Sequence, residues 1–116
     1  AKDDAEALLA SRSIATSALV KTAFFGEDAN WGRIIAAAGY SKATLDQSLV
    51  SIRFDDIEIV AQGLGLGLEQ EAKASEVLKQ AEFTVTVDLG LGSGSAYYYT
   101  SDLSYDYVRI NADYRT

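Results

Sequence analysis

Leu19–Tyr40, with the sequence LVKTAFFGEDANWGRIIAAAGY, is the stretch that decides the fold. It contains Trp31, the single tryptophan of the chain. Ile34, Ile35 and Ala38 follow the tryptophan at the spacing that places all four apolar side chains on one face of a helix. A helix with such a face must bury it, so we expect it to pack on a sheet.

Polar residues and a glycine mark the boundaries of this helix. Asp28 or Asn30 can accept hydrogen bonds from the unpaired amides of the first turn. Gly39 stands where a helix that ends needs a residue in the left-handed conformation. Before the helix, Val20 and Phe24 belong to an alternating pattern that predicts a strand over 19–25, which Gly26 ends.

Two further segments have helical spacing. Asp3 and Glu6 form the D-x-x-E pattern of a capping box and predict a helix over 4–16, in which Ala5, Leu8, Leu9, Arg12 and Ala15 recur at helical intervals. The second segment, 69–80, predicts a surface helix that buries Ala74, Val77, Leu78 and Ala81.

Alternating apolar and polar residues predict the remaining strands, at 50–54, 57–61, 83–89, 96–100 and 105–116. Asp55-Asp56 separates two of them and predicts a tight hairpin. The glycine runs at 63–67 and 90–94 predict a bend before a helix and a hairpin turn. We therefore expect one domain, residues 1–116, of the α+β class: a small α/β roll with helices packed on one face of a mixed β-sheet.

Composition excludes several classes of function. The chain has 116 residues, ten of them basic and seventeen acidic, and its formal net charge is −7. Such a charge argues against nucleic acid or an anionic membrane as a partner. No apolar run approaches the length of a membrane span, so we expect a soluble chain.

Missing residue types limit the chemistry further. The chain contains no Cys, His, Pro or Met. Without Cys or His, it cannot form a zinc site or a Ser-His nucleophile pair by itself. Carboxylates at Asp55-Asp56 or at Asp102 and Asp106 leave a calcium site as an alternative, although solvated turn carboxylates are the commoner case.

The glycine run Gly63-Leu-Gly-Leu-Gly67 is not a phosphate loop, because its spacing is not G-x-G-x-x-G and no Lys-Ser or Lys-Thr follows it. Lys21 and Thr22 are neighbours on a predicted strand, where they would point to opposite faces. We therefore assign no catalytic residue, cofactor or metal to this chain.

The segments LVKTAFFGEDANWGRIIAAAGYS, residues 19–41, and SDLSYDYVRINADYRT, residues 101–116, resemble the ornithine acetyltransferase family, the glutamate N-acetyltransferases of arginine biosynthesis. The order and position of the two matches place the chain as the C-terminal part of the family's β chain. The resemblance implies a cytoplasmic enzyme made as a precursor that cleaves itself. Its partners would be the N-terminal α chain and the rest of the β chain.

The family's nucleophile is the N-terminal threonine of the β chain. It takes an acetyl group from N-acetylornithine and passes it to glutamate, and members of the family differ in whether acetyl-coenzyme A is also a donor. That threonine lies upstream of this chain, so we expect no transfer from these residues alone.

The resemblance carries two substrate-binding residues onto this chain, Asn111 and Thr116. An amide can donate to a carboxylate and accept from an ammonium group, and a terminal carboxylate can pair with an amino group. Without the resemblance, both would be interpreted as structural or solvent-exposed. Asp28, Asn30 and Arg33 are interpreted as a cap, a turn and a charge partner, and Trp31 as a core anchor.

The alternative is a stand-alone structural or binding domain without catalysis, engineered from such a template. Members of the family often carry Pro at the position of Ala29 and Cys at that of Ser101. A part of a larger enzyme should expose an apolar patch that a stand-alone domain would lack. The tyrosines at 97–99 are typical of a sheet edge or an interface and are compatible with a homo-oligomer.

Overall fold

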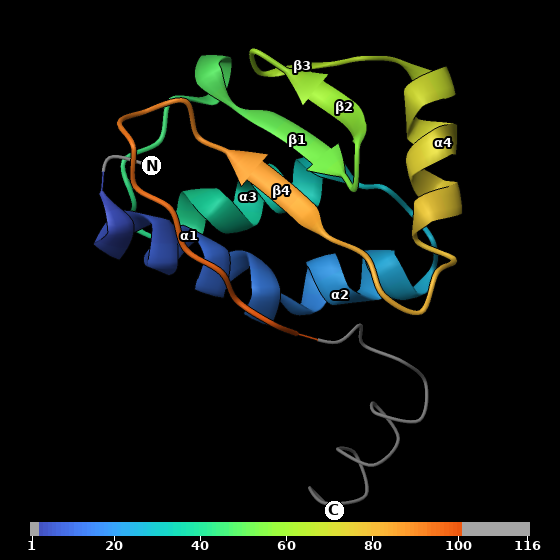
Figure 1. Ribbon diagram of the computed structural model, residues 1–116, viewed down its shortest axis with the longest axis horizontal. Coiled ribbons are helices and arrows are strands. Elements are labelled where there is room, and N and C mark those ends of the chain that lie inside the picture. Colours follow the sequence, from blue (N-terminus) through green and yellow to red (C-terminus); the bar gives the residue numbers. More distant parts are fainter. Residues whose placement is uncertain (1–2, 101–116) are drawn as a thin grey trace, which may run out of the picture.

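The computed structural model describes residues 3–100, and the strand predicted over 105–116 lies outside them. Figure 1 shows the arrangement of the elements. The helices are α1 (Asp4–Thr16), α2 (Ala18–Phe25), α3 (Trp31–Tyr40) and α4 (Leu68–Val77), and a short 3-10 turn, η1, covers Gln47–Leu49. The strands are β1 (Ser51–Phe54), β2 (Ile57–Ala61), β3 (Leu64–Gly65) and β4 (Val85–Asp88).

The four strands form one sheet in the order β3-β2-β1-β4, and every pair is antiparallel. The α+β class is therefore confirmed, while the sheet in the described part of the chain is antiparallel rather than mixed. α3 lies behind the sheet, α1 and α2 run along the side of β4, and α4 stands beside the end of the sheet where β1 turns into β2 (Figure 1).

The hairpin predicted at Asp55-Asp56 is confirmed. Phe54 pairs with Ile57 across a two-residue turn, in which Asp55 has a φ of 52°. The amide of Asp55 donates to the carbonyl of Thr84 (2.7 Å), and its Oδ1 accepts from the amide of Thr84 (2.9 Å). Asp55 therefore joins the hairpin to the segment that leads into β4.

One continuous core joins the sheet to all four helices. Phe54, Ile34 and Ile52 are completely buried, and Phe24 packs edge-on against Phe54 and Phe83 with ring centroids 5.7 and 5.6 Å apart. The other fully buried large side chains are Ile59, Val20, Val50 and Val60. Ala10 of α1 and the predicted residues Ala74, Val77 and Leu78 of the α4 region belong to the same cluster.

The strand predicted over 19–25 is wrong, because this segment forms helix α2. The hydroxyl of Ser17 caps the helix by accepting from the amide of Val20 (3.3 Å). Val20, Ala23 and Phe24 face the core at helical spacing. A short run with few polar residues fits either period, and packing against α3 decides in favour of the helix.

The tryptophan helix is confirmed as α3, with Ile34, Ile35 and Ala38 buried. The expected end at Gly39 is wrong, since the helix continues through it to Tyr40. Lys42, with a φ of 68°, takes the left-handed conformation instead.

The predicted helix over 4–16 is confirmed as α1. Asp3 Oδ1 accepts from the amide of Glu6 (2.8 Å), which is one half of the expected capping box. The Glu6 carboxylate does not return this contact; it accepts from the amide and the hydroxyl of Thr44 (3.1 and 2.8 Å). Glu6 thus fastens the loop after α3 to the start of α1.

The first glycine run is more ordered than the predicted bend. Leu64 and Gly65 form β3, and a Cβ atom on Gly65 would lie 3.0 Å from Cζ2 of Trp31. Gly63 has a φ of 76° and passes so close to the carbonyl of Gln47 that a side chain there would collide with it. These two glycines let β3 lie directly over the indole.

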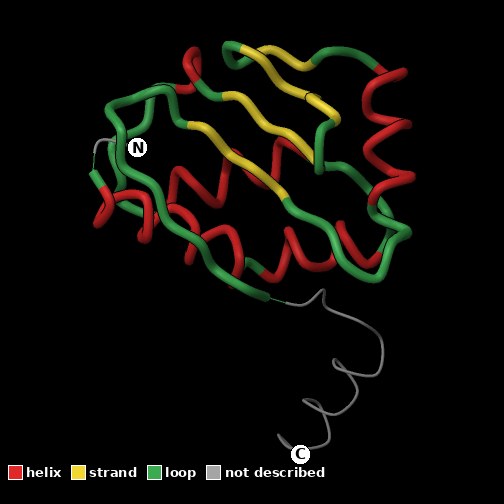
Figure 2. The backbone as a smooth tube through the Cα atoms, viewed as in Figure 1, coloured by secondary structure: helices red, strands yellow, loops and turns green. Residues whose placement is uncertain are grey.

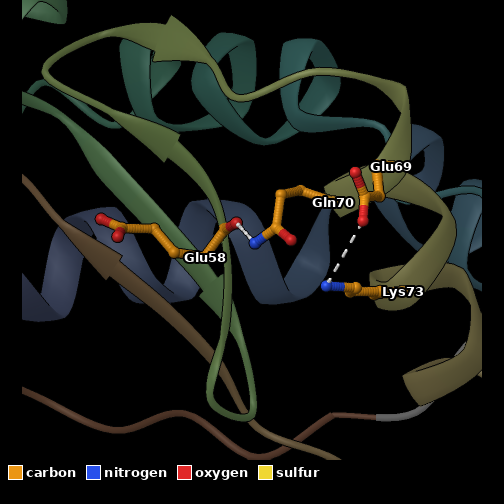
Figure 3. A network of polar contacts seen from close by, with 4 residues as sticks. All are labelled: Glu58, Glu69, Gln70 and Lys73. Carbon is orange, nitrogen blue, oxygen red and sulfur yellow. Dashed lines mark hydrogen bonds and ion pairs between the residues drawn. The ribbon is translucent and has the colours of Figure 1, made fainter.

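The helix predicted over 69–80 is confirmed as α4, which begins at Leu68 and ends at Val77. Figure 3 shows how Gln70 anchors α4 to β2 by donating to the carbonyl of Glu58 (2.9 Å), while Lys73 pairs with Glu69 on the exposed side (3.9 Å). The expected burial of Ala81 is wrong; α4 has already ended there, and Ala81 is exposed.

The strand predicted over 83–89 is confirmed as β4, which pairs with β1. The strand predicted over 96–100 does not form, because no described strand lies beside this segment to pair with it. The chain instead runs along the outside of α1 (Figure 2). Within residues 3–100, no helix has the length and apolar character needed to cross a membrane.

Substituting Phe54→Ala should lower the free energy of unfolding by about 3–5 kcal/mol, because the ring is fully buried and the site has little room to collapse. Phe25→Ala removes an equal side chain from an exposed position and should cost less than about 1 kcal/mol. Urea denaturation of both variants measures the difference. Equal losses would contradict the assignment of the core.

Candidate functional site

The two predicted substrate-binding residues, Asn111 and Thr116, lie outside the described residues. Thr100, the last described residue, donates from its hydroxyl to the carbonyl of Ala15 (2.8 Å).

Polar residues within segment 19–40 hold the turn between α2 and α3. Asn30 Oδ1 accepts from the amide of Arg33 (3.1 Å) and caps α3, and Asn30 Nδ2 donates to Asp28 Oδ2 (3.2 Å). Asn30 is therefore the cap, as one of the two predicted alternatives, and Asp28 orients it.

Arg33 was expected to be a charge partner, and this is wrong in the described structure. Its guanidinium Nη1 donates to the backbone carbonyl of Leu19 (3.0 Å), which ties the start of α2 to α3. The ion pairs between residues 3 and 100 are on α4 and just after it, at Lys73–Glu69 and Lys79–Glu76.

Trp31 packs against the core and is partly buried, as the anchor role predicts. Its indole Nε1 donates to Glu71 Oε1 on α4 (3.2 Å). Because Gly65 covers the same ring, the indole joins β3 and α4 to α3.

The described residues do not supply an activated nucleophile at Lys21 and Thr22. These residues are neighbours on α2, and adjacent side chains of a helix do not face each other. The Thr22 hydroxyl donates to the carbonyl of Ala18 (2.7 Å), as helical threonines do. In the helix, as in the predicted strand, the Lys21 and Thr22 side chains therefore do not face each other.

The acidic residues of the described chain are spread over its surface, and residues 3–100 contain no group of three or more metal-ligating side chains. The carboxylate of Asp55 is used in the hairpin contact to Thr84. At the end of the α4 region, the hydrogen bond from Lys79 to Glu76 (2.9 Å) raises the pKa of the exposed Lys79 ammonium. The pair Asp102 and Asp106 lies outside the described residues.

An apolar groove on α1 is the most distinctive feature of the described surface. It has a volume of about 460 Å³ and is lined by Ala5, Leu8, Leu9, Arg12 and Tyr98. Leu8 and Leu9 keep 49% and 47% of their surface exposed. Arg12 is the single charged side chain of the lining, so the groove fits an apolar partner surface better than a polar metabolite.

The groove was missed by sequence analysis, although its signal was present. The helical recurrence at 5, 8, 9, 12 and 15 predicts α1, but only its last member lies on the side of the helix that packs on the core. Ala7, Ala10 and Ala15 are the buried residues of α1. The helix therefore has a small-residue face toward the protein and a leucine face toward the groove.

Comparison with known proteins matches the whole chain to one family. The model of the ArgJ family matches residues 1–116. The chain is 65% identical to the arginine biosynthesis bifunctional protein ArgJ of Syntrophotalea carbinolica and 58% identical to that of Geobacter sulfurreducens. Both alignments cover 100% of this chain but 30% of the relative, so the chain spans less than a third of their length.

A solved structure has the same fold. The crystal structure of the arginine biosynthesis bifunctional protein from Bacillus halodurans superposes with a TM-score of 0.91 at 42% sequence identity. The superposition covers 98% of this chain and 54% of the solved chain.

Substituting Asn30→Ala should lower the free energy of unfolding by about 1 kcal/mol, because α3 loses its cap. Asn30→Ser keeps an oxygen for the amide of Arg33 and should restore most of this loss. Chemical denaturation of the two variants measures it. If the serine variant were as unstable as the alanine variant, the capping role would be wrong.

Proposed function

Because this chain belongs to the ArgJ family, we propose that it forms the C-terminal domain of a glutamate N-acetyltransferase of arginine biosynthesis. In this proposal, residues 1–116 are a single domain that supplies substrate-binding residues and a scaffold. The nucleophile belongs to the preceding part of the enzyme. The match of the family model along the entire chain is the observation that carries the proposal.

The reaction needs two acyl-transfer steps. A threonine hydroxyl attacks the acetyl carbonyl of N-acetylornithine, the bond to the ornithine nitrogen breaks, and ornithine leaves with a proton. The amino group of glutamate then attacks the acetyl-enzyme, which releases N-acetylglutamate and restores the hydroxyl. The threonine would lie at the start of the family's β chain, upstream of these 116 residues.

Asn111 and Thr116 would act by holding the amino-acid substrate. The Asn111 amide would donate to the α-carboxylate of glutamate, and Thr116 would contact the same amino-acid substrate. Both contacts fix the position of the amine that attacks the acetyl group. Correct placement of reacting groups is a large part of the rate acceleration in such a transfer.

The described surface supports membership of a larger assembly. Leu8 and Leu9 would be costly to leave in water along an open groove, and an isolated binding module would be expected to cover them. This observation favours the enzyme over the stand-alone alternative. The partners in this proposal are the α chain and the remainder of the β chain, and the setting is the cytoplasm.

Mixing this chain with the preceding part of the enzyme should restore acetyl transfer from N-acetylornithine to glutamate, whereas the chain alone should show none. Asn111→Ala in the mixture should raise the KM for glutamate by about tenfold to a hundredfold, because a hydrogen bond to a charged group is lost. Steady-state kinetics measure both quantities. Asn30→Ser is the control, since it conserves the fold and lies in the cap of α3.

A folded mixture without turnover would contradict the enzyme assignment. Unchanged glutamate kinetics in the Asn111→Ala mixture would contradict the substrate role of Asn111 while leaving the enzyme assignment in place.

A further inference from the structure

Residues 95–100 form a segment, here called the strap, that is fixed to α1 at both ends. At the start of the strap, the amide of Ser95 donates to Asp4 Oδ1 (2.9 Å). At its end, the hydroxyl of Thr100 donates to the carbonyl of Ala15 (2.8 Å). The strap therefore runs along the helix in the same direction as α1, as Figure 2 shows.

The distance between the two attachment points forces the strap into an extended conformation. From Asp4 to Ala15 the helix rises by about 16 Å, at about 1.5 Å per residue. The chain from Ser95 to Thr100 reaches at most about 18 Å when it is fully stretched. There is little slack, so the strap has the backbone extension of a β-strand without belonging to the sheet.

The backbone in the middle of the strap is unpaired within the described part of the chain. The residues from Ala96 to Tyr99 make no hydrogen bond there, whereas Ser95 and Thr100 hold the ends. Extended backbone with unpaired amides and carbonyls is a template on which another strand can pair.

The side chains of the strap alternate as they do in a strand that covers a surface. Tyr98 lies against the groove on α1, while Tyr97 and Tyr99 are 88% and 95% exposed. Tyrosine has high β propensity and is enriched in the buried centres of protein interfaces. Two nearly fully exposed tyrosines on one side of an extended segment, unpaired within the described residues, are characteristic of a docking surface.

We propose that the strap is an open β-strand that pairs with a strand from the preceding part of the enzyme. This inference rests on the proposed function, in which that part exists. The length of the relatives supports it as the occupant: this chain corresponds to 30% of the Syntrophotalea relative and to 54% of the solved Bacillus chain. A strand from the unmatched portion would cover the exposed tyrosines and satisfy the free backbone groups.

Hydrogen–deuterium exchange tests this pairing directly. The amides of residues 96–99 should exchange rapidly in the 116-residue chain. In the complete enzyme, with the preceding residues restored, those that face the added strand should exchange at least about a hundredfold more slowly. The amides of α3, which are paired in both forms, serve as the internal reference.

Charge placed on the strap should remove this protection. The double variant Tyr97→Asp with Tyr99→Asp in the complete enzyme should bring exchange at 96–99 back to within about threefold of the isolated chain, because two carboxylates would be buried against the partner strand. Tyr40→Asp is the matched control. Tyr40 is 85% exposed at the end of α3 and is not part of the strap, so its substitution should leave the protection unchanged.

Rapid exchange at 96–99 in the complete enzyme would overturn the proposal. Protection that appears in the 116-residue chain by itself and grows with its concentration would also overturn it, because the partner would then be a second copy. Neither result depends on turnover, so a failure of the pairing is distinguishable from a failure of the proposed function, which the kinetics with Asn111→Ala report.

Discussion

Burial of the apolar face of α3 against the sheet is the constraint on which the rest of this structure depends. Ile34 is completely buried, as are Ile52 and Phe54 of β1, and all three belong to the one core cluster. The cap at Asn30 fixes where α3 begins and therefore which of its residues meet the sheet. α1 and α2 then pack around α3, so a shift of this helix by one residue would displace every layer.

The described residues separate a packed interior from an apolar surface that is left open on the outside of α1. Asn30, Arg33 and Glu6 make hydrogen bonds that join one element to the next. The leucines of the groove and the tyrosines of the strap are left on the outside of α1.

Sequence patterns predicted the elements whose period and boundary signals agree. α3 has a strong apolar face and a capping asparagine, and the β1–β2 hairpin has clear alternation around Asp55-Asp56, so both were predicted correctly. The prediction for segment 19–25 failed because the segment is short and mostly apolar, and only contact with α3 distinguishes helix from strand. Gly39 failed because the chain turns at Lys42 instead, a position that no propensity rule favours.

Less of the candidate site than of the fold could be predicted from the sequence. Asn111 and Thr116 came from the resemblance and stay predictions, since they lie outside the described residues. The groove was missed because α1 has two apolar faces, one of alanines toward the core and one of leucines toward the groove. Both recur at helical spacing, so the sequence pattern does not tell which of them is buried. The strap was predicted as a strand, and its backbone is extended, but a local pattern contains no information about whether a neighbouring strand exists to complete the ladder.

The fluorescence of Trp31 reports on whether the structure around it is intact. The chain has one tryptophan, so its ultraviolet emission arises from a single indole. That indole lies beneath Gly65 and donates to Glu71, so its surroundings change whenever β3 or α4 detaches from α3. Loosening of this corner would admit water around the ring and shift the emission toward the red, even while the remaining helices stay folded.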